Sequence, residues 1–391
     1  MRAAVASVIA AIPGQVRKAP DLHRIAGVDT KLSWRLLKVA RAANPLTAGP
    51  YVPGPANIRS FVRAASRAGV GDDLLADVDS ASNEFEKFVV AHAGDRSAFD
   101  SMISALTKGE NADQANLQHR RAAFRANRHL WGVQATTQVK CSFTDIGDDP
   151  TKVNVALVDG YVGLRQLRRD APLIISCTRV SRDDGSAVPV TRQPIDPHAV
   201  SAYGLTLLED FCSDPTPRLR EVRAAAGFVY GELVSNGVGN GGALTCFTGW
   251  RANNAAGRYR APNNMSAITH GAVRVPCEAI TICMLMRAGM FGAVVPELAI
   301  YSDHMAQLPY PAHTHRMDNL LLPNENVAYL GRGARALSTT EISRLPEMAQ
   351  YVFDQLGWDG QQFDVFQCRI VYPIMPSTVA VSHDLPEAPR S

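Results

Sequence analysis

The chain has 391 residues, enough for two or three domains that each bury a core. Hydrophobic residues make up 46% and charged residues 20% of it, which excludes a wholly disordered chain and a coiled-coil rod. The formal net charge of +3 is too small for the molecule as a whole to attract a polyanion.

The N-terminal end is nevertheless strongly basic. Residues 1–45 carry eight Lys and Arg against two Asp, a formal charge of +6. Helical spacing of apolar residues predicts helices over 3–12, 21–26 and 30–43. Four prolines and two glycines in 45–55 predict a loop or hinge.

A pattern of two helices and a tight turn lies within this basic end. Gly27 separates the second helix from the third and can take a positive φ without steric cost. In the third helix, Leu32, Leu36, Val39 and Ala43 form one apolar stripe, and a cationic stripe lies beside it. A helix packed on its apolar stripe can present its cations to the DNA major groove.

Residues Asp21–Lys38, roughly one twentieth of the chain, resemble the helix–turn–helix of bacterial transcriptional regulators. His23 departs from the family, which usually has alanine there, and Ser33 replaces a branched apolar residue. The resemblance implies that residues 30–38 form the groove-facing helix. The expected DNA contacts are Arg24, Thr30, Lys31, Arg35, Lys38 and Arg41. Trp34 is expected in the core or at a dimer contact, and a helical cap with solvated cations is the alternative for the whole segment.

Helical spacing resumes over 58–65, 74–91, 98–107 and 111–131. The last of these carries a second basic stripe through Arg121, Arg125 and Arg128. We expect this stripe to pair with the acidic segment 72–110 rather than to contact DNA.

After Gly132 the pattern changes to β-branched and alternating residues. Strands are predicted over 136–144, 152–158, 172–180, 243–248, 271–275, 294–301 and 363–372. Helices are predicted among them over 199–211, 216–235, 276–290 and 340–356, and the tail from Pro373 is expected to be extended. The absence of strict β-α-β alternation favours a mixed α+β domain.

Signals for chemistry in this larger domain are few. The glycine-rich segment 236–242 lacks the lysine and hydroxyl of a phosphate-binding loop and is interpreted as a flexible turn. His304, His313 and His315, with Asp303 or Asp318, are candidate ligands of a divalent metal. The alternative for these histidines is that they are hydrogen-bonded surface residues. No catalytic residue and no cofactor are predicted.

The seven cysteines are widely spaced and form no Cys-x-x-Cys pair, which favours a reducing cytoplasm over a disulfide framework or a zinc ribbon. No apolar run of about 18 residues predicts a membrane span. Residues 3–12 are interpreted as a helix and not as a signal peptide.

The sequence therefore predicts an α+β protein with three parts. These are a helix–turn–helix region with a Pro-rich hinge (1–55), a helical connector (56–131) and a mixed α+β domain (132–391) for ligand sensing or oligomerisation. The function that this arrangement favours is a cytoplasmic, sequence-specific DNA-binding transcriptional regulator. It would act as a homo-oligomer, with dimers expected, on double-stranded DNA, with a small-molecule effector and no membrane partner. A metal-dependent enzyme of the C-terminal domain and a self-assembling structural protein are the alternatives.

Overall fold

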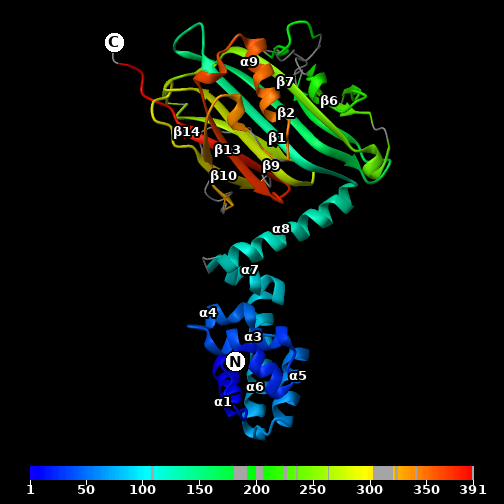
Figure 1. Cartoon of the computed structure of the whole chain (residues 1–391), viewed down its shortest axis with the longest axis vertical. Coiled ribbons are helices and arrows are strands. Elements are labelled where there is room, and N and C mark those ends of the chain that lie inside the picture. The colour runs from blue at the N-terminus through cyan, green and yellow to red at the C-terminus, as the bar shows by residue number, and fades with distance from the viewer. Residues whose placement is uncertain are drawn as a thin grey trace. The chain divides into compact units, whose positions relative to one another are not determined.

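The computed structural model divides into two compact units, Met1–Ala115 and Asn116–Ser391. Helices fill the first unit and sheets dominate the second, so the chain is of the α+β class (Figure 1). The described residues are 1–106, 110–179, 192–199, 206–223, 227–234, 237–262, 264–302, 320–321, 325–337, 339 and 341–389.

The helices of the first unit lie where the sequence predicts them. Only the Pro-rich segment differs, because it holds two short helical turns in place of a loop. Proline is tolerated in the first turn of a helix, and the side chain of Asn44 caps the first of these turns by accepting a hydrogen bond from the Thr47 amide (2.9 Å). The elements are α1 (Arg2–Ala11), α2 (Ala19–Ala26), α3 (Thr30–Arg41), α4 (Pro45–Ala48), η1 (Gly49–Tyr51), α5 (Pro55–Arg67), α6 (Asp72–Ala93), α7 (Arg96–Leu106) and α8 (Glu110–Trp131), which crosses into the second unit.

One hydrophobic core joins α1, α2, α3, α5 and the first half of α6. Val5, Leu36, Phe61 and Val78 are all completely buried in it. The predicted separation of residues 1–55 from a connector of 56–131 is therefore wrong at its first boundary. A 55-residue helical segment buries too little apolar surface by itself, and α5 and α6 complete the core.

The described residues of the second unit form three sheets. Their strand orders are β12-β13-β9-β1-β2-β7-β4, β11-β10-β14-β8 and β3-β6-β5. The strands are β1 (Val133–Ile146), β2 (Lys152–Gln166), β3 (Leu173–Arg179), β4 (Thr206–Leu207), β5 (Leu219–Arg223), β6 (Phe228–Leu233), β7 (Leu244–Gly257), β8 (Ser266–Val273), β9 (Cys277–Arg287), β10 (Glu297–Ser302), β11 (Leu320–Leu321), β12 (Ala328–Arg332), β13 (Phe363–Val371) and β14 (Ser377–Asp384).

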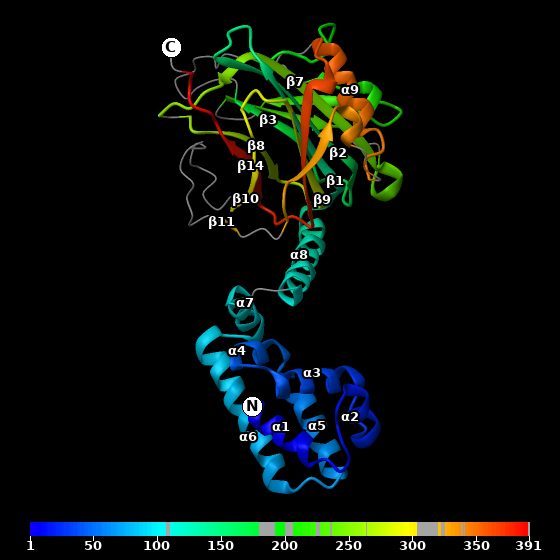
Figure 2. The same ribbon diagram turned by 60° about the vertical axis from the view of Figure 1, so that its left-hand side comes forward.

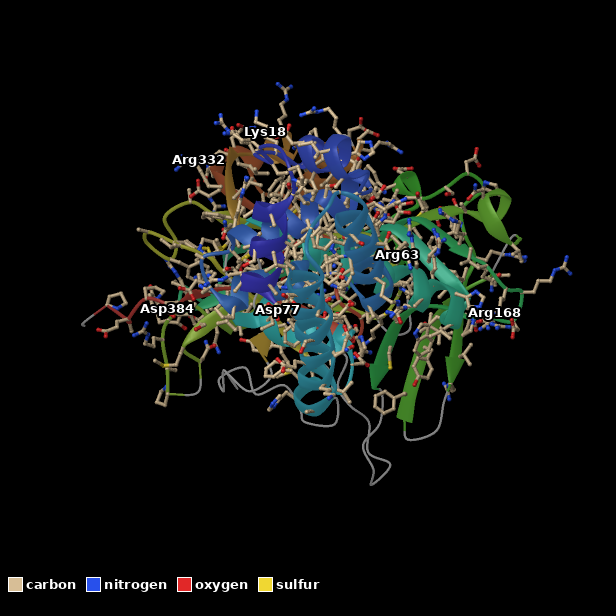
Figure 3. The ribbon with its side chains drawn as sticks, turned by 90° about the horizontal axis from the view of Figure 1, so that it is seen from below. Lys18, Arg63, Asp77, Arg168, Arg332 and Asp384 are labelled. Carbon is tan, nitrogen blue, oxygen red and sulfur yellow. The ribbon has the colours of Figure 1, made fainter. Side chains whose placement is uncertain are left out.

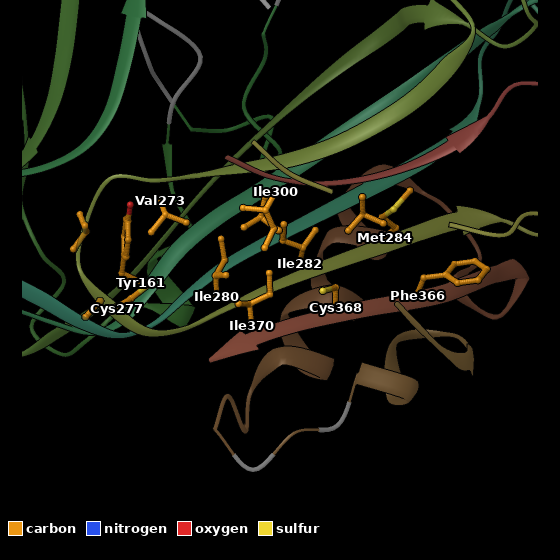
Figure 4. Close-up of a cluster of buried hydrophobic side chains, with 14 of the residues drawn as sticks. Tyr161, Val273, Cys277, Ile280, Ile282, Met284, Ile300, Phe366, Cys368 and Ile370 are labelled. Carbon is orange, nitrogen blue, oxygen red and sulfur yellow. The ribbon is translucent and has the colours of Figure 1, made fainter. Parts of the chain in front are cut away.

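The seven-stranded sheet is buried on both faces. One face packs against the smaller sheets, with Ile280, Ile282 and Met284 of β9 in the core between them (Figure 4). The opposite face is covered by α9 (Leu345–Leu356), and both Figure 1 and Figure 2 show this helix against the sheet. Phe353 of α9 contacts Phe143 of β1 edge-on, with ring centroids 5.3 Å apart.

The sequence predictions for this unit are confirmed for most strands and wrong for several helices. Helix 340–356 is present as α9, whereas 276–290 is strand β9, and segment 216–235 holds strands β5 and β6. Segment 199–211, so far as it is described, holds the short strand β4 and the 3₁₀ turn η2 (Glu209–Phe211). A strand buried on both faces is apolar throughout, and its periodicity cannot be distinguished from that of a buried helix. The tail is not merely extended, because β14 pairs with β10 and β8 inside the four-stranded sheet.

Candidate nucleic-acid interface

The turn between α2 and α3 has the backbone geometry that its sequence requires. Gly27 ends α2 in the left-handed conformation (φ 69°), where glycine has no steric cost. Asp29 then caps α3, its carboxylate accepting hydrogen bonds from the amides of Lys31 (2.9 Å) and Leu32 (3.1 Å). The two helices are therefore joined by a tight, defined turn.

The apolar face of α3 anchors this helix in the core of the unit. Leu32, Leu36 and Val39 are buried, as the sequence predicts. Ala43 is exposed, because the helix ends at Arg41. The stripe thus fixes which side of α3 faces the solvent.

The solvent face of α3 carries cations around an exposed tryptophan. Lys31, Trp34, Lys38 and Arg41 are all exposed, and their spacing of three and four residues places them on one side of the helix. Trp34 is 48% exposed, so of its two expected positions, the core and a dimer contact, the core is wrong and the dimer contact stays a prediction. The Lys38 ammonium lies 5.5 Å from the centre of its ring, and Tyr51 meets that ring edge-on at 5.5 Å.

Arg35 is not on this face. Its guanidinium is half-buried and donates hydrogen bonds to the carbonyls of Tyr51 (3.3 Å) and Val52 (3.2 Å). Burial lowers the pKa of Arg35, and the neighbouring Arg96 adds to this effect. The side chain of Arg35 holds the Pro-rich segment against α3, and its predicted role as a DNA contact stays a prediction that the structure does not favour.

The remaining predicted DNA contacts are all exposed, and they differ in the partners that their side chains have. Thr30 is exposed at the first turn of α3. Arg24 is exposed and lies 3.9 Å from the Asp21 carboxylate, which is a weak surface pair. Arg41 donates a hydrogen bond to the carbonyl of Arg17 (2.6 Å). The exposure of Trp34 was not predicted from the sequence, although its spacing from Lys31 and Lys38 places it on the cationic face of α3.

The structure does not describe the candidate metal ligands that the sequence predicts. His304, His313 and His315 lie outside the described residues. Within the described ranges, no group of three or more His, Cys, Asp or Glu side chains is placed to hold a metal ion. The same part of the chain contains no helix with the length and apolarity needed to cross a membrane.

Arg121 and Arg128 of the second basic stripe, and Arg120 beside it, have partners within their own unit. Arg120 pairs with Glu325 at 2.7 Å, with both side chains largely buried. Arg121 lies 5.8 Å from the ring centre of Tyr372, and Arg128 donates a hydrogen bond to Gln134. The expected pairing with the acidic segment 72–110 stays a prediction.

Comparisons with known proteins add no family. The sequence matches no family model and no curated protein. Among solved structures, a candidate protease from Parabacteroides distasonis is similar with a TM-score of 0.26 and 9% identity, over 64% of this chain. The chain spans 40% of the length of that structure, and so low a score supports no conclusion about fold or activity.

Proposed function

We propose that the N-terminal unit binds double-stranded DNA through α3 and that the protein is a transcriptional regulator. The observation that carries the proposal is the exposed face of Lys31, Trp34, Lys38 and Arg41 on a helix whose opposite face is buried. A major groove about 12 Å wide admits such a helix, and cations on its outer side reach base edges and phosphates.

The side chains divide into two kinds of contact. Thr30, Lys31 and Lys38 are placed on the groove-facing helix, where direct contacts to base edges are made. Arg24 on α2 and Arg41 in the last turn of α3 serve as phosphate contacts, which add affinity without sequence information. The ring of Trp34, held by Lys38 and Tyr51, offers an apolar surface to thymine methyl groups.

The second unit has the roles of association and sensing in this proposal. One small helix buries little DNA surface, so two copies would bind two half-sites as a homodimer. Leu130 and Trp131 in the last turn of α8 are 67% and 58% exposed, and a second copy would cover such apolar surface. All seven cysteines are unpaired, which is consistent with a cytoplasmic location.

The test is a fluorescence-anisotropy titration of the full chain with labelled random-sequence duplex at a series of KCl concentrations. Lys31→Ala/Lys38→Ala is expected to weaken binding and to lower the slope of log K against log salt by about two units. Arg67→Ala/Lys87→Ala, which removes the same charge from exposed positions of α5 and α6, is the matched control. Equal losses in both variants, or no salt-dependent binding by the wild type, would contradict the proposal.

Self-association as the main function is the second candidate, favoured by the same exposed pair on α8. Multi-angle light scattering of the wild type and Leu130→Glu distinguishes the two. A dimer that dissociates in the variant fits a regulator, whereas assemblies far larger than a dimer fit a structural protein.

A further inference from the structure

A pocket in the sheet-rich unit gathers positive charge from segments far apart in the sequence. It has a volume of about 560 Å³ and lies where the end of α8, the start of β1, the end of β2 and the 3₁₀ turn η4 (Gly239–Gly242) meet. Its polar lining consists of Arg125, Arg128, His129, Gln134, Arg165 and Asn240. Among the described residues no carboxylate lines this pocket, so three guanidinium groups share it without a counterion.

Gln134 supplies a buried donor that lacks an acceptor. The residue is 1% exposed, and its Oε1 accepts a hydrogen bond from Nη1 of Arg128 (3.2 Å). That bond fixes the orientation of the amide, since exchanging O and N would set two donors against each other. The Nε2 atom is then left without a hydrogen-bond partner in the part of the chain that the structure describes. A buried donor without an acceptor is costly, and Gln134 is one of the residues that line the pocket.

The elements around the pocket are held to one another by the backbone. The carbonyl of Gly132, between α8 and β1, accepts hydrogen bonds from the amides of Leu167 (2.7 Å) and Arg168 (3.2 Å) after the end of β2. Figure 3 labels the side chain of Arg168. Gly132 has φ +67°, and a Cβ there would lie 2.5 Å from Nε of Arg168, so the junction requires glycine.

Contacts also hold two of the three arginines, Arg128 and Arg165, and the glycine-rich segment in place. Arg128 lies 5.7 Å from the ring centre of Phe124, and Nη1 of Arg165 donates to the carbonyl of Gly163 (3.2 Å). Val238 pairs with Gln166 of β2, which brings the glycine-rich segment beside the pocket. The donors of Arg128, Arg165 and Gln134 are therefore arranged before any ligand arrives, which reduces the entropy lost on binding.

We infer that this pocket binds a phosphate group, carried by a small phosphate ester or by the backbone of a nucleic acid. Guanidinium groups present paired N–H donors that match phosphate oxygens, and the Gln134 amide adds a neutral donor. The pocket lies in the second unit and does not depend on α3, so this inference stands whether or not the N-terminal unit binds duplex DNA.

The experiment measures binding of inorganic phosphate to the full chain by isothermal titration calorimetry at constant ionic strength. Saturable binding is expected in the wild type. Arg125→Ala is expected to raise the Kd at least about tenfold through loss of a charged donor. Gln134→Glu places a carboxylate against Arg128 and is expected to raise the Kd by as much or more.

Folding and general charge effects have their own controls. The melting temperature of Gln134→Glu without phosphate is expected to equal or exceed that of the wild type, because the new carboxylate pairs with Arg128. Arg169→Ala removes an exposed charge outside the pocket and is expected to leave the Kd unchanged. Absence of saturable phosphate binding in the wild type, or the same Kd in the wild type, Arg125→Ala and Gln134→Glu, would overturn the inference.

Two further titrations distinguish the sources of the phosphate. Adenosine monophosphate that binds more tightly than inorganic phosphate, with the same dependence on Arg125, assigns the pocket to a small ester. A short oligothymidylate that binds with this dependence, while the mononucleotide does not exceed inorganic phosphate, assigns it to a nucleic-acid backbone.

Discussion

Ser33 and His23 hydrogen-bond to the same carbonyl oxygen, that of Val28 in the turn between α2 and α3. The Ser33 hydroxyl donates to it at 3.2 Å, and Nδ1 of the His23 ring lies 2.7 Å from it. These are the two positions at which the sequence departs from the helix–turn–helix pattern. Each departure replaces an apolar packing contact with a hydrogen bond to the turn, so the pair of helices remains connected.

Ser33→Ala tests this connection. Ser33 is completely buried, and the substitution is expected to reduce the free energy of unfolding of the helical unit by about 0.5–1.5 kcal/mol, since His23 still serves the carbonyl. Urea denaturation followed by circular dichroism at a helix band measures the change. Ser66→Ala, at an exposed position of α5, is the control, and equal effects in both variants would argue against the role of Ser33.

Arg35→Ala is expected to affect stability and not DNA contact. Loss of its bonds to the Tyr51 and Val52 carbonyls should cost about 1–3 kcal/mol of unfolding free energy. The salt slope of duplex binding should stay at the wild-type value, in contrast to Lys38→Ala. A lowered slope in Arg35→Ala would place this side chain on the DNA after all.

The ion pair of Asp145 and Arg287 joins β1 to β9 at the C-terminal ends of these two inner strands of the seven-stranded sheet. Nη2 of Arg287 lies 2.7 Å from Asp145, a second guanidinium nitrogen bonds the same carboxylate, and the carboxylate is nearly buried. The hydrogen bonds that Arg287 donates to the Asp145 carboxylate raise the pKa of Arg287. Asp145→Asn is expected to cost about 3–5 kcal/mol of unfolding free energy, because it leaves a charge partly buried without its partner.

The double variant Asp145→Leu/Arg287→Met provides the comparison. It removes both charges and should recover most of the stability lost in Asp145→Asn. Urea midpoints of the three proteins, followed by tryptophan fluorescence, decide the matter. A double variant less stable than Asp145→Asn would show that the sheet needs the ion pair itself.

The stability of the sheet-rich unit is expected to fall on mild acidification. Burial lowers the pKa of His270 and His383 below their usual 6.5, and Lys140 lowers that of His270 further. The unfolded chain then takes up protons as the pH falls through about 6.5, while the folded protein does so only at lower pH. These two histidines therefore leave the free energy of unfolding unchanged well above pH 6.5 and reduce it as the pH falls below about 6.5.

Urea midpoints at about pH 7.5 and about pH 5.5 measure this effect. His383→Gln should reduce the difference between the two midpoints, and His198→Gln, at an exposed position, should leave it unchanged. The same midpoint at both pH values in the wild type would refute the linkage.

Gly160 permits the close approach of β2 and β7. A Cβ at this position would lie 2.2 Å from the Phe247 ring and 2.6 Å from the Cys246 carbonyl, so Gly160→Ala is expected to cost about 1–3 kcal/mol or more. Gly241→Ala, where the added atom meets nothing within 4 Å, is the matched control. The melting temperatures of both variants are compared with that of the wild type. A melting temperature of Gly160→Ala close to that of Gly241→Ala would mean that β2 and β7 move apart at little cost.

Local pattern predicted the helical unit better than the sheets. The stripe of Leu32, Leu36 and Val39 repeats within a few residues, so the buried face of α3 was readable from the sequence. It could not be predicted that β9 is a strand, because apolar and polar residues do not alternate in a segment that is buried on both faces. The half-buried position of Arg35 and the exposure of Trp34 were not predicted either, since position next to an apolar stripe does not say which side of the helix a neighbouring segment covers.

By itself, the sequence determined that helices precede strands, that the N-terminal end is basic, and that a glycine turn separates two amphipathic helices. Only the tertiary structure decided that Arg35 serves the Pro-rich segment, that β9 lies in the middle of a sheet, and that Arg125, Gln134, Arg165 and Asn240 line one pocket. The physical reason is distance along the chain. Helical periodicity and turn chemistry act between residues a few positions apart, whereas strand pairing and pocket assembly join residues separated by tens to hundreds of positions.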